Sequence, residues 1–539
     1  MKRRLSRGFG DSACAGEQAK RQRPQTADKT AMELKIELTE REKRLERLLL
    51  DVAAFVDGGA DRQGTQPLVL RWAGGWVRDR LLGRESHDID TAIDTMTGFA
   101  FALKMQEFCG MAANAARHGM EPRDLGSLHK VEANPDKSKH LETATVRIFD
   151  MEVDFVNLRR ETYTAESRNP LVEFGTPEED ALRRDATVNA LFYNLNCGTV
   201  EDFTGGVADM EARLIRTPLQ PLQTFTDDPL RVLRLVRFAS RLQFRIDPAA
   251  EAVMADPSVL QALQQKISRE RVGTEVEKML KGNHPRDSLQ LIDRLGLYHA
   301  IFTDPAHADA PKPRLDGWTA TYETLNHLAA TTTPGSVYDV LVRTEEAQYF
   351  AWVLAAAVPW DQVSEQGGIR APNKLSDVIT GAHRHRADIL ALKQAVCDGA
   401  PCMRERDRFG MAIRTWEARG SNWKLQVLYA LLFEVLTLAT KQAEGAGTAA
   451  AWTAERDALL CGWQAFLDHL QELDVLDAPH IKRLLDGKQV AAALAVRPGK
   501  WMAAAMDICM AWQLRHPGET DPAGAIEEVR RRKDEIGLS

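Results

Sequence analysis

Strand-forming runs are confined to one part of the chain, between residues 67 and 203. There, apolar and β-branched residues follow one another or alternate with polar ones, and Gly-containing turns separate the runs. Beyond Asp227 such runs almost vanish, and segments rich in Ala, Leu and Arg continue with helical periodicity to the end. The pattern predicts an α/β domain with a mixed sheet, followed by an all-α region. The expected strands are 67–72, 88–93, 143–149, 152–158, 190–195 and 200–203.

The length of the chain implies more than one hydrophobic core. Its 539 residues, 44% of them hydrophobic, exceed what a single core normally organises. The first thirty or so residues are rich in Arg, Lys, Gln, Ser and Gly, which is typical of a disordered tail. The expected order is a disordered tail at 1–31, a mostly α/β domain at 32–218 that opens with a charged helix at 32–55, and helical regions at 219–290, 291–400 and 401–539.

Charge, apolar runs and cysteines narrow the function classes. A formal net charge of −7 argues against a basic coat, so a nucleic acid would need a local positive stripe. Arginines at helical spacing within 231–245 predict such a stripe. The longest apolar run, near 425–439, is shorter than the roughly 20 residues of a membrane span and predicts a buried helix. The seven cysteines show no zinc-type spacing and favour a reducing compartment.

A glycine pair follows the first predicted strand. Gly74 and Gly75 stand between that strand and a helical segment, and Arg78 follows three residues later. Backbone without side chains can approach a phosphate closely, the first N–H groups of a helix face an anion, and an arginine can reach its oxygens. Taken alone, the pair would indicate only a tight strand–helix junction.

Two aspartates on the next predicted strand change that interpretation. Asp88 and Asp90 are two positions apart, so their side chains point to the same face. Paired carboxylates are unfavourable unless a cation lies between them, and their hard oxygens suit Mg²⁺. A neighbouring strand supplies a third carboxylate, which we assign to Asp154, although Glu152 lies on the same face. Three carboxylates could hold two metal ions, as in metal-assisted phosphoryl transfer.

Five sequence blocks, in order, resemble the class II nucleotidyltransferases, the branch that contains CCA-adding enzymes and bacterial poly(A) polymerases. Two further segments, 140–145 and 173–177, resemble the eukaryotic CCA-adding enzymes in particular. The resemblance implies an α/β nucleotidyltransferase head domain followed by an all-α neck, body and tail. The five blocks are 74–90, 182–191, 201–206, 227–234 and 268–271.

The same resemblance implies roles for individual residues. Asp88 and Asp90 would be the metal ligands and, together with Asp154, the catalytic residues. The nucleotide would be bound by Gly74, Gly75, Arg78, Arg183, Arg184, Asp185, Asn189, Asp228, Arg231 and Arg234.

Asp228 and Arg231 form a candidate base-reading pair. They are three positions apart on a predicted helix, so both side chains would project on one side. Cytosine and adenine both present an amino donor beside a ring-nitrogen acceptor, which a carboxylate and a guanidinium match, whereas uracil and guanine do not. In isolation, the two residues would be an ordinary surface ion pair.

Together these features imply template-independent addition of CCA to the 3′ end of tRNA, with Mg²⁺ as cofactor, CTP and ATP as substrates, and pyrophosphate released. No membrane is involved. A poly(A) polymerase or a CC-adding enzyme of the same fold is the alternative, and a catalytically inactive RNA-binding protein is a second one that the intact Asp88 and Asp90 disfavour. The protein is expected to be intracellular, and the sequence does not decide between cytoplasm, nucleus and mitochondrion. It does not indicate the oligomeric state either.

Overall fold

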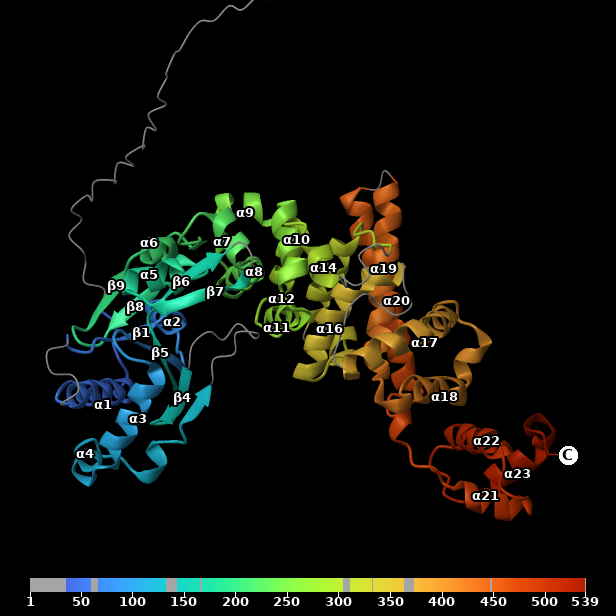
Figure 1. Ribbon diagram of the computed structural model, residues 1–539. Coiled ribbons are helices and arrows are strands. Elements are labelled where there is room, and N and C mark those ends of the chain that lie inside the picture. Colours follow the sequence, from blue (N-terminus) through green and yellow to red (C-terminus); the bar gives the residue numbers. More distant parts are fainter. Residues whose placement is uncertain are drawn as a thin grey trace, which may run out of the picture.

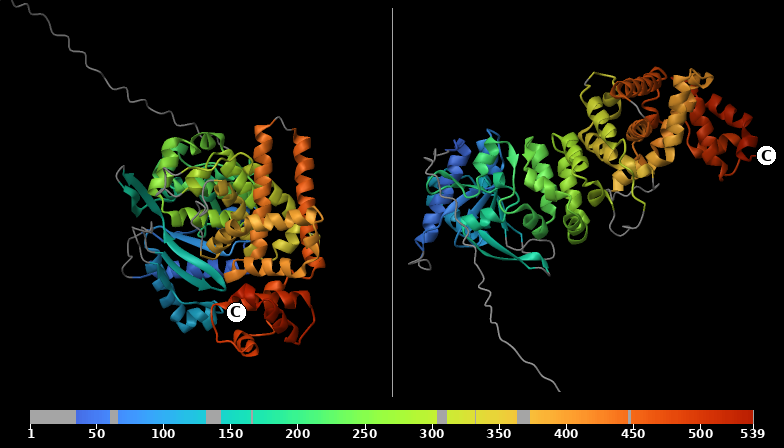
Figure 2. Two further views of the ribbon diagram at one scale, coloured as in Figure 1. Left: turned by 90° about the vertical axis from the view of Figure 1, so that its right-hand side faces the viewer. Right: turned by 90° about the horizontal axis from the view of Figure 1, so that it is seen from above.

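The computed structural model describes residues 35–59, 66–131, 143–164, 167–303, 311–331, 333–362, 373–445 and 448–538. The tail expected at 1–31 lies outside these residues. The chain forms an elongated molecule in which the sheet-containing head lies at one end and the C-terminus at the other (Figures 1 and 2).

The head is built on a seven-stranded sheet with the order β3-β4-β5-β2-β1-β8-β9. β2 and β5 pair in parallel and all other neighbours are antiparallel, so the sheet is mixed, as predicted. The strands are β1 Leu70–Ala73, β2 Asp88–Ile93, β3 His129–Val131, β4 Thr143–Ile148, β5 Met151–Asn157, β8 Leu191–Asn194 and β9 Thr199–Asp202.

All six predicted strands are present, with ends displaced by no more than three residues. The prediction missed β3 and a separate hairpin of β6, Arg159–Thr164, with β7, Ser167–Phe174. These segments are rich in charged and polar residues and lack the apolar alternation that marks a strand with one buried face. It also missed a two-residue parallel pair of β10, Leu214–Ile215, with β11, Arg245–Ile246.

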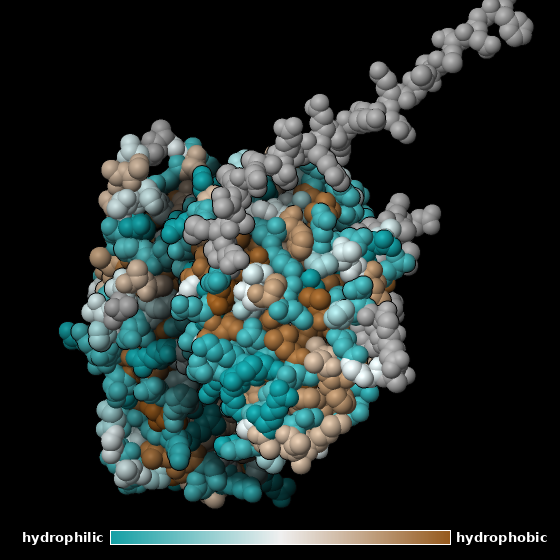
Figure 3. Space-filling model, turned by 90° about the vertical axis from the view of Figure 1, so that its left-hand side faces the viewer, coloured by the Kyte–Doolittle hydropathy of each residue, from teal (hydrophilic) through white to brown (hydrophobic). Residues whose placement is uncertain are grey.

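Helices α1, Glu40–Asp57, and α3, Gly98–Gly110, pack against each other and against the sheet. The helix predicted at 32–55 begins later than expected. Thr39 and Glu42 form a capping box that starts α1 at Glu40. The remaining head helices are α2 Gly75–Leu81, α4 Ala112–Arg117, α5 Pro177–Leu182 and α6 Gly206–Glu211. The end of the head seen in Figure 3 is mainly hydrophilic, with scattered apolar patches of the kind found on most globular proteins.

Among the residues described beyond the head, β11 is the one strand and the other regular elements are helices. Its helices are α7 Pro221–Asp227, α8 Leu230–Leu242, α9 Pro248–Met254, α10 Pro257–Lys266, α11 Arg269–Leu280, α12 Pro285–Arg294, α13 Tyr298–Phe302, α14 Trp318–Ala329, α15 Val337–Leu341, α16 Glu345–Ala357, α17 Asn373–Cys397, α18 Arg406–Trp416, α19 Trp423–Glu444, α20 Ala449–Glu472, α21 Gly487–Leu494, α22 Trp501–Arg515 and α23 Ala523–Arg531. One continuous core extends from Leu45 in the head to Leu514, whereas the last three helices share a small core of their own.

Helix α19 contains the longest apolar run of the sequence. It is the one helix among the described residues that is long and apolar enough to cross a bilayer, yet 67% of its most apolar segment is buried inside the protein. It packs against α14, α16, α17 and α20. This environment is that of a core helix, as predicted.

We predict that Gly98→Ala lowers the free energy of unfolding by about 1–3 kcal/mol, the usual cost of forcing atoms into a packed core. A β-carbon at Gly98 would lie 2.0 Å from the carbonyl oxygen of Phe155 on β5. Gly110→Ala, at the other end of the same helix, is the matched control, since its β-carbon would meet no atom within 4 Å. Equal urea-unfolding curves for the two variants would contradict the prediction.

Candidate active site

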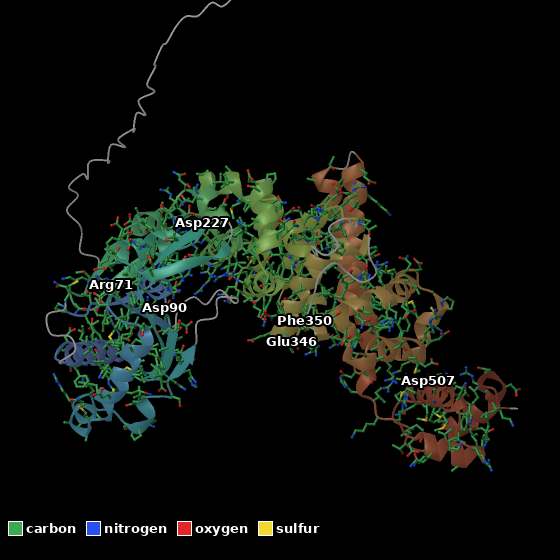
Figure 4. The ribbon with its side chains drawn as sticks, in the orientation of Figure 1. Arg71, Asp90, Asp227, Glu346, Phe350 and Asp507 are labelled. Carbon is green, nitrogen blue, oxygen red and sulfur yellow. The ribbon has the colours of Figure 1, made fainter. Side chains whose placement is uncertain are left out.

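A cleft of about 460 Å³ lies between the head and α8. Its head side includes Asp90 and its helical side includes Asp227, which approach from separate parts of the chain (Figure 4). Ten basic and five acidic side chains line it, so the cleft is positive although the whole chain is negative. An anionic ligand is therefore favoured here.

The structure brings most of the predicted site residues together in this cleft. Asp88 and Asp154 do not line it but stand on β2 and β5 next to Asp90. Those that do line it are Gly74, Gly75, Arg78, Asp90, Arg183, Arg184, Asp185, Asn189, Asp228, Arg231 and Arg234.

The glycine turn leads from β1 into α2. Gly74 has φ of 69°, a left-handed conformation that favours glycine, and a β-carbon there would lie 2.8 Å from Nη1 of Arg184. Nη1 of Arg184 in turn donates a hydrogen bond to the carbonyl oxygen of Asn189 at 3.1 Å. The turn is thus shaped by a close approach of an arginine as well as by backbone conformation.

The acidic residues lie on two parallel neighbours of the sheet. The register places Asp90 opposite Asp154 and Asp88 opposite Glu152. Asp154 accepts a hydrogen bond of 2.5 Å from the hydroxyl of Thr145 on β4. Within the described part of the chain, no three His, Cys, Asp or Glu side chains converge closely enough to enclose a metal ion.

Asp90 lines the cleft and is accessible to solvent. Partial burial raises the pKa of its carboxyl group, and the nearby charges of Asp154 and Asp88 raise it further, while Arg184 and Arg159 oppose the change. A carboxylate that lies beside other negative charges favours a cation as partner.

A buried carboxylate that sequence reasoning missed organises the predicted arginine pair. Asp180 accepts hydrogen bonds from Arg183 at 2.6 and 2.9 Å, and from Arg184 at 2.9 and 3.1 Å. Burial would raise the pKa of Asp180, but the two guanidinium groups hold it below its usual value. Its position three and four residues before the arginines on one helical turn was a usable signal.

Asp185 joins the head to the helical region. It accepts a hydrogen bond of 2.6 Å from Nε of Arg234 on α8, and one of 3.1 Å from the amide of Asn189. Although Asp185 is buried, Arg234 and Asn189 hold the pKa of its carboxyl group well below the usual range. Asn189 also accepts a hydrogen bond from Arg78, so four predicted residues form one network.

The expected helical geometry of the base-reading pair was wrong. Asp228 follows the last residue of α7 and has an extended backbone, and α8 begins only at Leu230. One carboxylate oxygen of Asp228 accepts the N–H of Leu230 at 3.1 Å, so the residue acts at the helix start instead of within it. Pro229 accounts for the break, because it disfavours helical conformation in the preceding residue. Asp228 and Arg231 nevertheless line the same cleft.

Four of the five arginines expected to form a positive stripe within 231–245 line the cleft, but they are largely paired with acids. Arg237 pairs with Glu275 at 2.6 Å and Arg241 with Asp79 at 3.2 Å. Arg245 lies beyond the end of α8, on β11. The arginines that line the cleft are held largely by acids of the protein itself, which helical periodicity alone could not reveal.

Two further cleft residues, Arg159 and Glu161, were also missed. Both lie on β6, in the hairpin that the sequence pattern did not indicate. Glu161 accepts a hydrogen bond of 3.0 Å from Arg183.

Replacing Asp185 by Asn should lower the free energy of unfolding at pH 7 by about 1–3 kcal/mol, because Arg234 loses its hydrogen bond to a carboxylate and keeps only a longer contact of 3.6 Å with Glu275. Since the folded pKa of Asp185 lies below its unfolded value, the stabilisation is present above about pH 4 and is lost as the pH falls further. The difference between wild type and variant should therefore shrink below about pH 4.

Urea unfolding across this pH range measures the effect. Asp150→Asn is the control, since Asp150 is a 65% exposed partner of Arg147. A pH-independent difference for Asp185→Asn would contradict the assignment.

Comparison with known proteins agrees with this geometry. Residues 70–216 match the family model described as Poly A polymerase head domain, and residues 243–310 match that described as probable RNA and SrmB-binding site of polymerase A. Nucleotidyltransferase lcsQ of Purpureocillium lilacinum is 55% identical, covering 93% of each chain. The mitochondrial CCA tRNA nucleotidyltransferase of Candida glabrata is 34% identical, covering 90% of this chain and 94% of its own.

A solved CCA-adding enzyme in an apo form shares the fold, with a TM-score of 0.61 and 18% identity over 92% of this chain and 96% of that one. This chain belongs to the CCA tRNA nucleotidyltransferase family, because it is 34% identical to a relative of that name over 90% of its length and shares the fold of a CCA-adding enzyme.

Proposed function

We propose that this chain adds the 3′-terminal CCA sequence to tRNA without a template, using CTP and ATP and releasing pyrophosphate. The observation that carries the proposal is one positive cleft that joins the glycine turn and Asp90 to Asp228 and Arg231. Relatives named CCA tRNA nucleotidyltransferase support it. Solved structures of the same fold include complexes of CCA-adding enzymes with CTP and with tRNA.

Enzymes of this family generally use divalent metal ions. Asp88 and Asp90 fit such an ion, because they share one strand face and because neighbouring carboxylates raise the pKa of Asp90. We propose Mg²⁺, which prefers carboxylate oxygens. When bound, it would activate the attacking 3′ hydroxyl and neutralise charge on the leaving pyrophosphate.

The protein's own groups would position the nucleotide. The glycine turn allows phosphates to approach the backbone at the start of α2, and Arg78, Asp185 and Asn189 form a rigid network beside it. Arg183 and Arg184, held by Asp180, shape the wall of the cleft. Fixed donors of this kind need no rearrangement when the substrate binds.

Base selection would depend on Asp228 and Arg231. Arg231 is 6% exposed and donates a hydrogen bond of 2.7 Å to the carbonyl oxygen of Arg183. The second oxygen of Asp228 lies 3.6 Å from Arg271. Both charged groups are thus held in place by the protein, and U or G would turn a donor toward Arg231 and an acceptor toward Asp228, a mismatch that is costly in a partly desolvated site.

The tRNA would lie along the helical regions, with its 3′ end in the cleft. The proposed units remain head 32–218, neck 219–290, body 291–400 and tail 401–539. The names of two relatives include the word mitochondrial. We therefore propose an intracellular location that includes the mitochondrion.

Purified protein should incorporate C and A, but not U or G, into a tRNA transcript that lacks its 3′ end. Sequencing the products made with each NTP measures this. Long A tails would identify a poly(A) polymerase, and products that stop at CC would identify a CC-adding enzyme.

Asp88→Ala should reduce incorporation about a thousandfold or more while tRNA binding persists, because the loss of metal stabilisation costs several kcal/mol. Comparing Asp154→Ala with Glu152→Ala identifies the third carboxylate by the larger loss.

Asp228→Ala and Arg231→Ala should lose discrimination between C or A and U or G, from roughly a thousandfold or more to within about tenfold. The ratio of kcat/KM values for the four NTPs is the measurement. Glu270→Ala, an exposed acid on α11, is the control. Unchanged NTP ratios in the first two variants would show that the base is read elsewhere.

A further inference from the structure

Arg159 differs from the other arginines of the cleft. It is the first residue of β6, lies in the wall near Asp90, and its positive charge acts on that carboxylate. Its Nε is shielded from solvent and has no hydrogen-bond acceptor. Across the described ranges of the chain, no acidic side chain forms an ion pair with Arg159.

The acids that could neutralise Arg159 are already engaged. Asp180 accepts hydrogen bonds from the side chains of both Arg183 and Arg184, and its contact with Arg159 is to the backbone N–H, at 3.1 Å. Glu161 accepts a hydrogen bond from Arg183. This wall therefore carries more guanidinium groups than carboxylates, and Arg159 is the one left without a carboxylate.

A guanidinium without an acidic partner in this position lowers the stability of the folded protein when no ligand is bound. Burial lowers the pKa of Arg159 to about 10, and the neighbouring Arg183 contributes to the same effect. Both causes disfavour the charged form, which an anion would stabilise. A planar guanidinium matches phosphate oxygens in a bidentate arrangement, which suits the most highly charged part of a nucleoside triphosphate.

We propose that Arg159 is a phosphate-binding residue, which holds the phosphates of the incoming nucleotide and the pyrophosphate product beside Asp90. This deepens the proposed function and rests on it. Arg183 and Arg184, whose guanidinium groups are bound to Asp180, would then mainly shape the wall, while Arg159 contacts the ligand.

Inorganic pyrophosphate with Mg²⁺ is the probe, and the shift that it causes in the melting temperature of the full chain is the measurement. Wild type should be stabilised, and Arg159→Met should need about 10- to 100-fold more pyrophosphate for the same shift, as expected for the loss of charge-assisted hydrogen bonds. The pyrophosphate concentration that Arg159→Lys needs should lie between those of wild type and Arg159→Met, because lysine keeps the positive charge but cannot donate two parallel hydrogen bonds.

Arg160→Met is the matched control. The side chain of Arg160 is exposed and pairs with Glu173 at 2.5 Å and with Glu179 at 3.6 Å. Pyrophosphate should stabilise this variant as it does wild type. An equal loss of pyrophosphate binding in both variants would indicate general electrostatics and overturn the assignment.

The melting temperature without ligand separates binding from structure. Arg159→Met removes an unpaired, partly buried cation, so the variant should melt no lower than wild type. A clearly lower melting temperature of Arg159→Met with unchanged pyrophosphate binding would make Arg159 a structural residue and refute the proposal. The proposal would also be refuted if pyrophosphate did not stabilise wild type. Failure of wild type to add C and A to tRNA would instead overturn the proposed function, and Arg159-dependent pyrophosphate binding would survive it.

Discussion

The ion pair between Asp185 and Arg234 connects the two halves of the site. Asp185 belongs to the head, beside Asn189 and the glycine turn, and Arg234 belongs to α8, one turn after Arg231. The proposed phosphate-binding groups and base-reading groups come from these two separate elements, so their relative position depends on contacts across the cleft. A hydrogen-bonded charge pair serves this purpose, because displacing Arg234 would leave the buried carboxylate of Asp185 without its charged partner.

The cleft also shows how a protein of negative net charge can bind a polyanion. Several acids in or beside it are engaged locally: Asp180 holds two arginines, Asp185 binds α8 through Arg234, and Asp228 accepts the backbone N–H of Leu230. The basic side chains outnumber the acids, so the local potential is positive where the ligand enters. Asp90 differs from these acids, because it stands opposite Asp154 on the neighbouring strand and favours a cation.

Much of the site could be predicted because its signals are local. A strand places every second side chain on one face, which was enough to put Asp88 and Asp90 together, and the structure confirms the strand to its last residue. Asp228 was misjudged because the prediction extended one helix across Pro229. The hairpin of β6 and β7 was missed because its polar sequence has no apolar period, and Arg159 and Glu161 were missed with it.

The sequence by itself determined the mixed α/β head, the helical remainder, the acid pair and the order of the blocks, because each is encoded in residues close to one another along the chain. Only the tertiary structure decided which charges meet: Arg234 with Asp185, 49 residues apart, and Arg231 with the carbonyl oxygen of Arg183, 48 residues apart. Ion pairs and cleft walls depend on distances in space, which spacing along the chain does not specify. For the same reason, only the fold could show that Arg159 has no acidic partner among the residues described here and faces the cleft.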